Sequence, residues 1–306
     1  MTSPGSAVTR RALLGMAVLV PLGACTRGTP PPSPSAPPPP PPPAPSRQFH
    51  DRLMELEKKF DARLGVYALD TEGGSTVEHR ADERFAFCST FKGVAAAAVL
   101  QRNPLSHLET RVRYSREDLM KHAPVTGQHV ATGMTIRQLC DAAVRFSDGT
   151  AGNLLLRDLG GPAALTAFTR SLGDTVTRMD RVEPAITEAT PGDLRDTTTP
   201  RAFAADYREI VLGDTLTADK RDFLRDLLQR NATGAERIRA GLPPGWTVAD
   251  KTGTGDYGTL NDIAVLWPPA KAPIVLAIMS SKAAKDAPYD QALLAEAAKY
   301  VAETFT

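Results

Sequence analysis

The chain has 306 residues, of which 42% are hydrophobic, so it has enough apolar material for one large folded domain or two fused lobes. Its formal net charge is +1, and charged residues of both signs are mixed along the chain. This balance gives no reason to expect a nucleic-acid partner.

The first 24 residues predict an export signal. Arg10 and Arg11 precede an apolar stretch over residues 12–22, which is shorter than the roughly 20 residues that a membrane-spanning helix needs. A cleaved signal peptide therefore fits better, and the arginine pair suggests twin-arginine export. The following Leu22-Gly23-Ala24-Cys25 resembles a bacterial lipobox, whose cysteine is lipidated after cleavage. We expect a lipoprotein anchored to the cell membrane through Cys25 and partly secreted; an ordinary signal peptide with an incidental cysteine is the alternative.

Residues 30–45 are almost entirely proline, serine and alanine. Such a run favours extended polyproline II, which at about 3.1 Å per residue could hold a domain roughly 50 Å from a membrane. A linker with no spacing role is the alternative. Either interpretation divides the chain into a signal peptide over 1–24, a lipidated cysteine and Pro-rich linker over 25–46, and a folded domain over 47–306.

Hydrophobic periodicity predicts the elements of that domain. Apolar residues at helical spacing predict helices, and alternating or short apolar runs predict strands. The middle of the domain, residues 100–229, reads as mostly helical with short loops. The other expected elements, in chain order, are a helix over 48–64, a hairpin of strands over 65–70 and 75–79, an alanine-rich helix over 90–100, strands over 247–250, 260–267 and 274–279, and a helix over 291–305.

Strands near both ends of the domain, with helices between them, predict an α/β (α+β) fold. We expect an antiparallel sheet lobe, with flanking terminal helices, built from about 47–81 and 231–306. An all-helical lobe over about 82–230 is inserted between these two parts.

Ser89 and Lys92 belong to the first of four short signatures, Ser89-Thr90-Phe91-Lys92. They are one helical turn apart, so both side chains can face the same pocket. A Ser-x-x-Lys can also be a surface turn, but apolar neighbours favour a buried lysine, which loses its proton more readily and can act as a base. Ser89 would lie at a helix N-terminus, where the dipole favours developing negative charge. The apolar neighbours are Phe85, Phe87, Phe91 and Val94.

The other three signatures follow in order and are Ser147-Asp148-Gly149, Glu183-Pro184 and Lys251-Thr252-Gly253. Together they indicate a serine acyl-transfer site with two lysines and a carboxylate. From about Phe49 to the C-terminus, the chain resembles a class A serine β-lactamase of the actinobacterial type. The resemblance implies the fold of serine β-lactamases and penicillin-binding proteins. It also implies hydrolysis of the β-lactam amide through a serine acyl-enzyme, conferring antibiotic resistance, by a monomer without cofactor or metal.

The resemblance gives each catalytic residue a role. Ser89 is the nucleophile, Ser147 passes a proton to the leaving nitrogen, and Glu183 activates the deacylating water. Either Lys92 or Glu183 takes the proton of the serine during acylation, because the family's acylation base is disputed.

Substrate binding is expected along residues 251–255. Lys251 attracts the substrate carboxylate and Thr252 hydrogen-bonds it. The Thr254 N–H joins the N–H of Ser89 in the oxyanion hole. Small residues such as Gly253 let the substrate lie along the strand.

Further residues support the site by the same resemblance. Asp148 braces the turn in which it lies, and Asn153 holds the catalytic glutamate. Arg181 and Asp196 form the ion pair that closes the loop carrying Glu183.

Two positions depart from the family pattern. Gly149 stands where an asparagine usually contacts the acylamino carbonyl of the substrate, and it has no amide to offer. Thr187 stands where an asparagine usually helps to position the deacylating water, and its hydroxyl has a shorter reach. A plain turn is the alternative for Ser147-Asp148-Gly149, and the presence of Asn153 argues against it.

A third departure concerns the substrate carboxylate. Many family members place an arginine on the strand after Lys-Thr-Gly, and the matching residue here is Leu260. Arg237 stands where other members supply a guanidinium from a neighbouring helix, so we expect it to bind substrate, because a planar fork suits a carboxylate. Arg239 is expected to pair with Asp250. A structural ion pair for each arginine is the alternative.

Cys88 and Cys140 are expected to be free, mostly buried thiols, since neither has an evident histidine partner. The five histidines are scattered and lack metal-ligand spacing, so no metal site is proposed. His122 stands where the family often has an aromatic gatekeeper; it either stacks on the substrate or is a plain loop histidine.

Two other functions share parts of this pattern. A penicillin-binding D,D-peptidase or esterase of the same fold would deacylate slowly on β-lactams, and Glu183 on its charge-closed loop argues against it. A non-catalytic β-lactam sensor domain would stay acylated. It would need a signalling partner or further transmembrane segments, and the sequence shows neither.

Overall fold

The computed structural model describes residues 45–305. The predicted export signal, the lipobox with Cys25 and nearly all of the predicted linker lie outside the described residues. Over the described part of the chain, no helix is long and apolar enough to cross a membrane.

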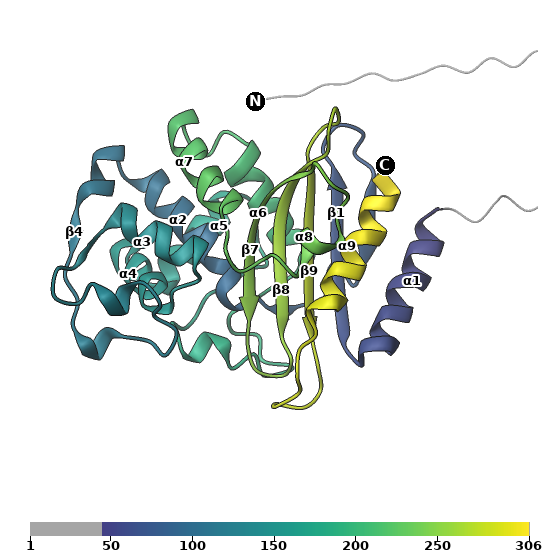
Figure 1. The fold of residues 1–306 in the computed structure, drawn as a ribbon, viewed down its shortest axis with the longest axis horizontal. Helices are drawn as coiled ribbons and strands as arrows, with labels where there is room; N and C mark the ends of the chain where they lie inside the picture. The colour runs from purple at the N-terminus through teal and green to yellow at the C-terminus, as the bar shows by residue number, and fades with distance from the viewer. Residues whose placement is uncertain (1–44, 306) are drawn as a thin grey trace, which may run out of the picture. The chain divides into compact units, whose positions relative to one another are not determined.

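Five antiparallel strands form the central sheet in the order β2-β1-β9-β8-β7 (Figure 1). The first two come from the N-terminal side of the domain and the last three from its C-terminal side, as the sequence predicts. Side chains of the inner strands and of β7 alternate between two apolar layers, so these strands are buried on both faces, whereas the edge strand β2 is buried on one face only. The strands are β1 (Arg63–Asp70), β2 (Thr76–His79), β7 (Thr247–Thr254), β8 (Leu260–Trp267) and β9 (Ile274–Ser281).

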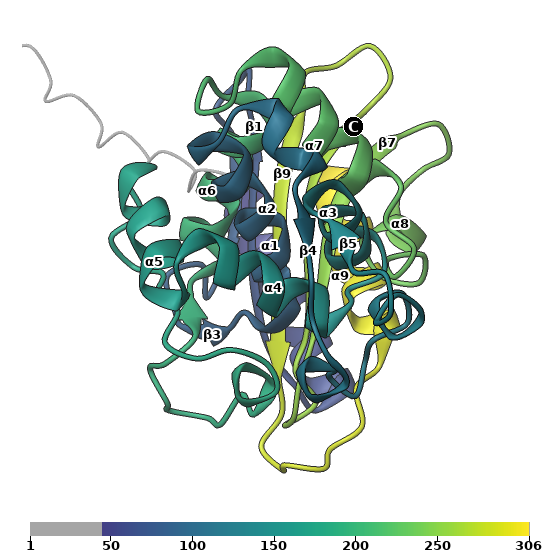
Figure 2. The same cartoon turned by 90° about the vertical axis from the view of Figure 1, so that its left-hand side faces the viewer.

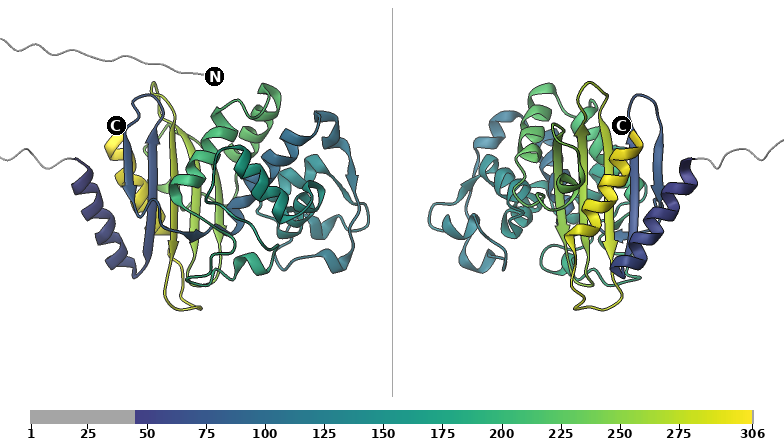
Figure 3. Two further views of the ribbon diagram at one scale, coloured as in Figure 1. Left: turned by 180° about the vertical axis from the view of Figure 1, so that it is seen from behind. Right: turned by 45° about the vertical axis from the view of Figure 1, so that its right-hand side comes forward.

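Three helices cover one face of the sheet: α1 (Pro45–Phe60), α8 (Ile238–Gly241) and α9 (Gln291–Phe305) (Figure 3). The C-terminal helix has the predicted bounds. The N-terminal helix ends four residues earlier than predicted, because Asp61 has a left-handed backbone with φ of 46°. Leu64, which the periodicity assigned to the helix, therefore lies on β1, where it is fully buried.

The inserted lobe is built around α2 (Phe91–Arg102), whose residues 91–100 are all buried. Helices α3 to α7 surround it (Figure 2). The alanine-rich sequence suits this position, since small side chains let five helices approach closely. The surrounding helices are α3 (Ile136–Arg145), α4 (Gly149–Leu159), α5 (Pro162–Ser171), α6 (Pro200–Leu212) and α7 (Ala218–Gln229).

Two short ladders also lie within the inserted lobe. In one, β4 (Arg111–Val112) pairs with β5 (Met134–Thr135); in the other, β3 (Phe85–Ala86) pairs with β6 (Thr197–Thr198). The second ladder joins the segment before Ser89 to the segment after Glu183. It therefore fixes the positions of two signatures that are distant in sequence.

Helix α6 contains a buried carboxyl group that makes the stability of the folded state depend on pH. Burial, reinforced by the nearby Asp174 carboxylate, raises the pKa of Asp206 well above its ordinary value of 3.8. The folded state thus holds this proton more tightly than the unfolded state. Stability is consequently lost as the pH rises from about 4 through the raised pKa.

Asp206→Asn should remove this loss, because the amide is neutral at every pH and nearly isosteric. The melting temperature of the variant relative to wild type should increase from pH 5 to pH 8, as measured by thermal unfolding. Asp286→Asn on the surface is the matched control and should give a constant difference. A constant difference for Asp206→Asn would contradict the raised pKa.

Candidate active site

Ser89 lies in the single turn η1 (Cys88–Thr90) that leads directly into α2. Lys92 follows one helical turn later, and its Nζ lies 2.9 Å from Ser89 Oγ. The lysine is fully buried, as its apolar neighbours predict. Nucleophile and candidate base are therefore in direct hydrogen-bond contact.

Two opposing effects set the protonation of Lys92. Burial lowers the pKa of the lysine, and the Glu183 carboxylate, whose Oε1 lies 2.6 Å from Nζ, opposes that decrease. Burial dominates. A lysine that loses its proton more easily than usual is suited to accept the proton of Ser89.

Glu183 contacts the same serine. Its Oε1 lies 3.1 Å from Ser89 Oγ. Asn153 on α4 holds the glutamate by its backbone: its side chain donates to the Glu183 carbonyl at 2.9 Å and accepts from the Glu183 N–H at 3.0 Å. The predicted role of Asn153 thus has a geometric basis in the structure.

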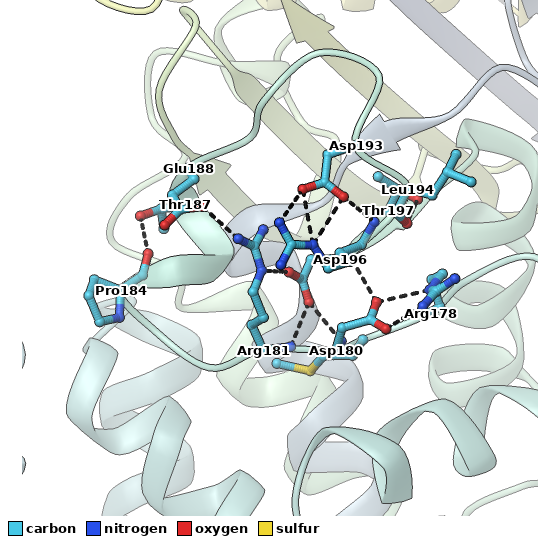
Figure 4. A network of polar contacts seen from close by, with 12 residues as sticks. Arg178, Asp180, Arg181, Pro184, Thr187, Glu188, Asp193, Leu194, Asp196 and Thr197 are labelled. Atoms are coloured by element: carbon cyan, nitrogen blue, oxygen red, sulfur yellow. Dashed lines mark hydrogen bonds and ion pairs between the residues drawn. The ribbon is translucent and has the colours of Figure 1, made fainter.

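Residues 180–196, called the Glu183 loop from here on, are closed by a network of charges (Figure 4). Arg181 pairs with the buried Asp196 at 2.6 Å, as predicted, and also with Glu188 at 2.6 Å. Asp196 accepts two backbone N–H groups, from Asp180 at 2.8 Å and Arg181 at 2.9 Å. A buried carboxylate satisfied in this way fixes the two ends of the loop together.

Ser147 lies between the two lysines of the site. Its Oγ is 3.1 Å from Lys251 Nζ and 3.5 Å from Lys92 Nζ. Asp148, fully buried, caps α4 through the Ala151 N–H and accepts from both the N–H and the hydroxyl of Thr126. The segment is thus a braced turn that holds a hydroxyl at the centre of the site.

Strand β7 brings Lys251 and Thr252 alongside the serine turn. Lys251 is fully buried, and burial lowers its pKa well below the ordinary value, with the positive charge of Lys92 adding to the effect. Gly253 permits the close approach, since a Cβ there would lie 2.7 Å from the Phe87 carbonyl oxygen. Any larger residue would force the strand away from Ser89.

Comparisons with known proteins show the family to which the chain belongs. Residues 48–305 match the profile of the Beta-lactamase enzyme family. The chain belongs to the β-lactamase enzyme family. It is 53% identical over 299 residues to a protein of Mycobacterium tuberculosis named "Beta-lactamase", a match that covers 96% of each chain. It is 56% identical over 255 residues to an Amycolatopsis lactamdurans protein of the same name, covering 83% of this chain and 84% of the relative.

A solved structure indicates the class of β-lactamase to which the chain is similar. The class A β-lactamase of Clostridium kluyveri superposes with a TM-score of 0.83 at 47% identity, covering 85% of this chain and 99% of the other. The predicted fold class is confirmed by this similarity. The catalytic roles of individual residues rest on the geometry described above.

The Gly149 departure has a structural consequence in this β-lactamase. A Cβ at Gly149 would overlap the Oε2 atom of Glu183 and would lie 3.1 Å from the Met120 Cβ. The carboxylate therefore occupies space that an asparagine would need. Position 149 offers the substrate no side-chain amide.

Thr187 uses its hydroxyl inside the Glu183 loop. The Oγ1 atom donates to the Pro184 carbonyl oxygen at 2.7 Å within η5 (Ala185–Thr187). Only the oxygen lone pairs remain to interact with a water near Glu183.

Arg237 contacts β7, the strand expected to bind substrate, and the neighbouring strand β8. Its guanidinium donates to Thr254 Oγ1 at 2.8 Å, to the Gly253 carbonyl at 3.0 Å and to the Asn261 carbonyl at 2.8 Å. Over the described residues, no carboxylate lies within ion-pair distance of Arg237, whereas Arg239 pairs with Asp250 at 2.6 Å as predicted. The charge of Arg237 is therefore not neutralised by a structural ion pair.

Arg237→Leu should raise KM for a penicillin roughly tenfold or more, because losing a charge-assisted hydrogen bond costs about 1.5–3 kcal/mol. Adding Leu260→Arg, across the ladder from Thr254, should recover part of the loss. Steady-state kinetics measure both effects, with Arg225→Leu on the surface of α7 as control. An unchanged KM in a normally folded Arg237→Leu protein would assign this arginine a structural role.

Two residues that sequence reasoning missed also shape the site. Asn261 on β8 donates to the Ala86 carbonyl at 2.8 Å and to the Phe87 carbonyl at 3.2 Å, which ties the sheet to the serine turn. Thr233 lies with its Oγ1 2.5 Å from Thr252 Oγ1. Neither belongs to a motif, so only the register of the sheet and the packing of the loop before α8 could reveal them.

The two described cysteines and His122 have no part in the contacts of the site described above. Cys88 and Cys140 are free and fully buried, as predicted, and burial raises the pKa of each thiol to about 12. Neither can supply a thiolate at neutral pH. His122 is exposed, and its Nε2 lies 3.1 Å from the Phe146 carbonyl oxygen.

Proposed function

We propose that this β-lactamase hydrolyses the β-lactam amide of penicillins and cephalosporins through an acyl-enzyme on Ser89, and so confers resistance. One observation carries the proposal: Ser89 Oγ lies within hydrogen-bond distance of both Lys92 Nζ, at 2.9 Å, and Glu183 Oε1, at 3.1 Å. A weakly acidic hydroxyl needs such a base in order to attack a carbonyl carbon. The matched relatives named "Beta-lactamase" support the same reaction.

Acylation begins when Lys92 or Glu183 takes the serine proton and Ser89 Oγ bonds to the lactam carbonyl carbon. The carbonyl oxygen becomes negatively charged, and the backbone N–H groups of Ser89 and Thr254 stabilise it. The ring C–N bond then breaks. Ser147, between the two lysines, donates its proton to the departing nitrogen and regains one from a lysine.

Deacylation uses the closed Glu183 loop. The Glu183 carboxylate takes a proton from a water, and the resulting hydroxide bonds to the ester carbonyl carbon. The bond to Ser89 Oγ breaks, the serine regains a proton, and the product leaves with a new carboxylate. Lys251, Thr252 and Arg237 hold the original carboxylate of the substrate during both steps.

Turnover of a chromogenic cephalosporin by the purified protein tests this function. Sustained turnover with many product molecules per enzyme is expected. One stoichiometric burst followed by no further product would instead indicate a penicillin-binding peptidase or a sensor domain, which remain acylated.

We also propose that the enzyme is a monomer that is exported, by the twin-arginine route, and anchored to the cell membrane through a lipid on Cys25, with a fraction secreted. The arginine pair and the lipobox-like Leu22-Gly23-Ala24-Cys25 support this proposal. Sedimentation of the purified protein measures its mass in solution and so tests whether it is a monomer.

Cys25→Ser should move the protein from the membrane fraction to the soluble fraction, because serine cannot carry the thioether-linked lipid. Immunoblots of separated fractions measure the change, and the neighbouring Thr26→Ser should leave the distribution unaltered. Membrane association that persists in Cys25→Ser would contradict lipidation at this residue.

A further inference from the structure

A cavity of about 890 Å³ lies against the Glu183 loop, and none of the catalytic side chains lines it. Its walls come from five segments: residues 57–63, residues 80–86, the Glu183 loop with the adjoining Thr197, Thr259 just before β8, and residues 281–283 at the end of β9. We call it the outer cavity. Its volume is within the range of small-molecule sites, about 300–1,000 Å³.

Positive charge exceeds negative charge on its walls. Seven cationic side chains line the cavity, namely Lys58, Arg63, Arg80, Arg84, Arg181, Arg195 and Lys282. Four acidic side chains line it, namely Glu57, Asp61, Glu83 and Asp193. The difference is three positive charges. A site of this kind attracts an anion.

Three of these cations have no carboxylate within ion-pair distance among the described residues. They are Lys58, Lys282 and Arg84, and the guanidinium of Arg84 donates instead to the neutral Thr197 hydroxyl and Val176 carbonyl. The other four arginines are already paired with acidic side chains. The unpaired charges are thus available to a ligand.

The uncharged lining mixes apolar and hydroxyl side chains, and one of its hydroxyl groups is unsatisfied. Pro191 and Ala283, which are exposed, and the half-buried Ala62 and Ala86 contribute apolar surface, whereas Phe85 and Ile186 are only 3% and 0% exposed. Thr259, which is 1% exposed and lines the same cavity, has a hydroxyl with no hydrogen-bond partner in the described part of the chain. A buried hydroxyl without a partner is uncommon and costs stability.

We propose that the outer cavity is a second ligand site, separate from the β-lactam site, which takes a small organic anion with an apolar aromatic body. The anionic group binds among Lys58, Arg84 and Lys282, and the body packs against the accessible apolar lining, chiefly Pro191. Carboxylates and sulfonates both provide oxygens that accept charge-assisted hydrogen bonds.

The position of the site links it to catalysis. Arg181 and Ile186, which line the cavity, flank Glu183 in the chain. The carbonyl of Thr259, another lining residue, accepts the Gly255 N–H at 3.1 Å, next to the oxyanion-hole residue Thr254. A ligand here contacts both the Glu183 loop and the turn that follows β7. Because this loop carries the carboxylate that activates the deacylating water, occupancy slows deacylation and so lowers kcat.

The test uses 8-anilinonaphthalene-1-sulfonate, an aromatic anion whose fluorescence rises on binding to apolar surface, and the full chain. In wild type, the dye should bind saturably and should reduce kcat for a chromogenic cephalosporin. Lys58→Glu/Lys282→Glu should weaken binding about tenfold or more, since two charged contacts become repulsive. Lys220→Glu/Lys299→Glu changes the net charge equally outside the cavity and should bind like wild type.

Equal binding by the two double variants would overturn the site. Saturable binding with unchanged kcat would overturn its link to catalysis. Thr259→Val, which removes the unsatisfied hydroxyl and keeps the shape, gives a second test. It should weaken binding without lowering the melting temperature, and unchanged dye affinity would remove Thr259 from the site. The binding measurement needs no turnover, so its failure would leave the proposed function unaffected.

Discussion

Replacing Ser89 by alanine should abolish covalent labelling of the protein by penicillin. Of the nucleophilic side chains in the described site, only Ser89 contacts both a lysine and a carboxylate. The adjacent Cys88 is fully buried, and its raised pKa, about 12, keeps the thiol protonated. Ser147 contacts the two lysines and not Glu183, so it lacks a carboxylate base.

Intact-mass spectrometry after incubation with benzylpenicillin measures this result. Wild type and Ser171→Ala, a control on the surface of α5, should both form the adduct when quenched early. An adduct of the same mass in Ser89→Ala, mapped to any other residue, would show that the nucleophile has been assigned wrongly.

Replacing Glu183 by glutamine should trap the acyl-enzyme. The amide cannot take a proton from water, and loss of a general base costs roughly 10²–10⁴ in rate. Acylated protein should therefore accumulate, which quenched mass spectrometry detects directly. Glu188→Gln, on the same loop but exposed, should turn over without accumulating adduct.

The same variant also separates the two candidate acylation bases. The Glu183 carboxylate lies 2.6 Å from Lys92 Nζ and favours its protonated form, so removing that charge should lower the lysine pKa further. If Lys92 is the base, the adduct should form at close to the normal rate. If Glu183 is the base, adduct formation should slow as well. Wild-type turnover with no adduct would rule out the deacylation role of Glu183.

Local patterns in the sequence predicted most elements because their causes are local. The strand over 260–267 and the helix over 291–305 have the predicted bounds, since apolar periodicity selects the backbone geometry that buries one face. The error at the end of α1 has the same origin. Leu64 fits the helical period, but a left-handed Asp61 ends the helix, and periodicity does not report backbone conformation at one residue.

The sequence by itself determined that Ser89 and Lys92 share a pocket, because three residues on one helix span a single turn. Only the tertiary structure decided that Glu183, 94 residues away, lies 3.1 Å from the serine. The tertiary structure also decided that Asn261 ties the sheet to the serine turn, and that the outer cavity gathers residues from five segments. Spacing along a helix follows from backbone geometry alone. Contacts between the lobes depend on how the sheet packs against α6 and α7 and on the ion pair that closes the Glu183 loop, and these are properties of the whole folded chain.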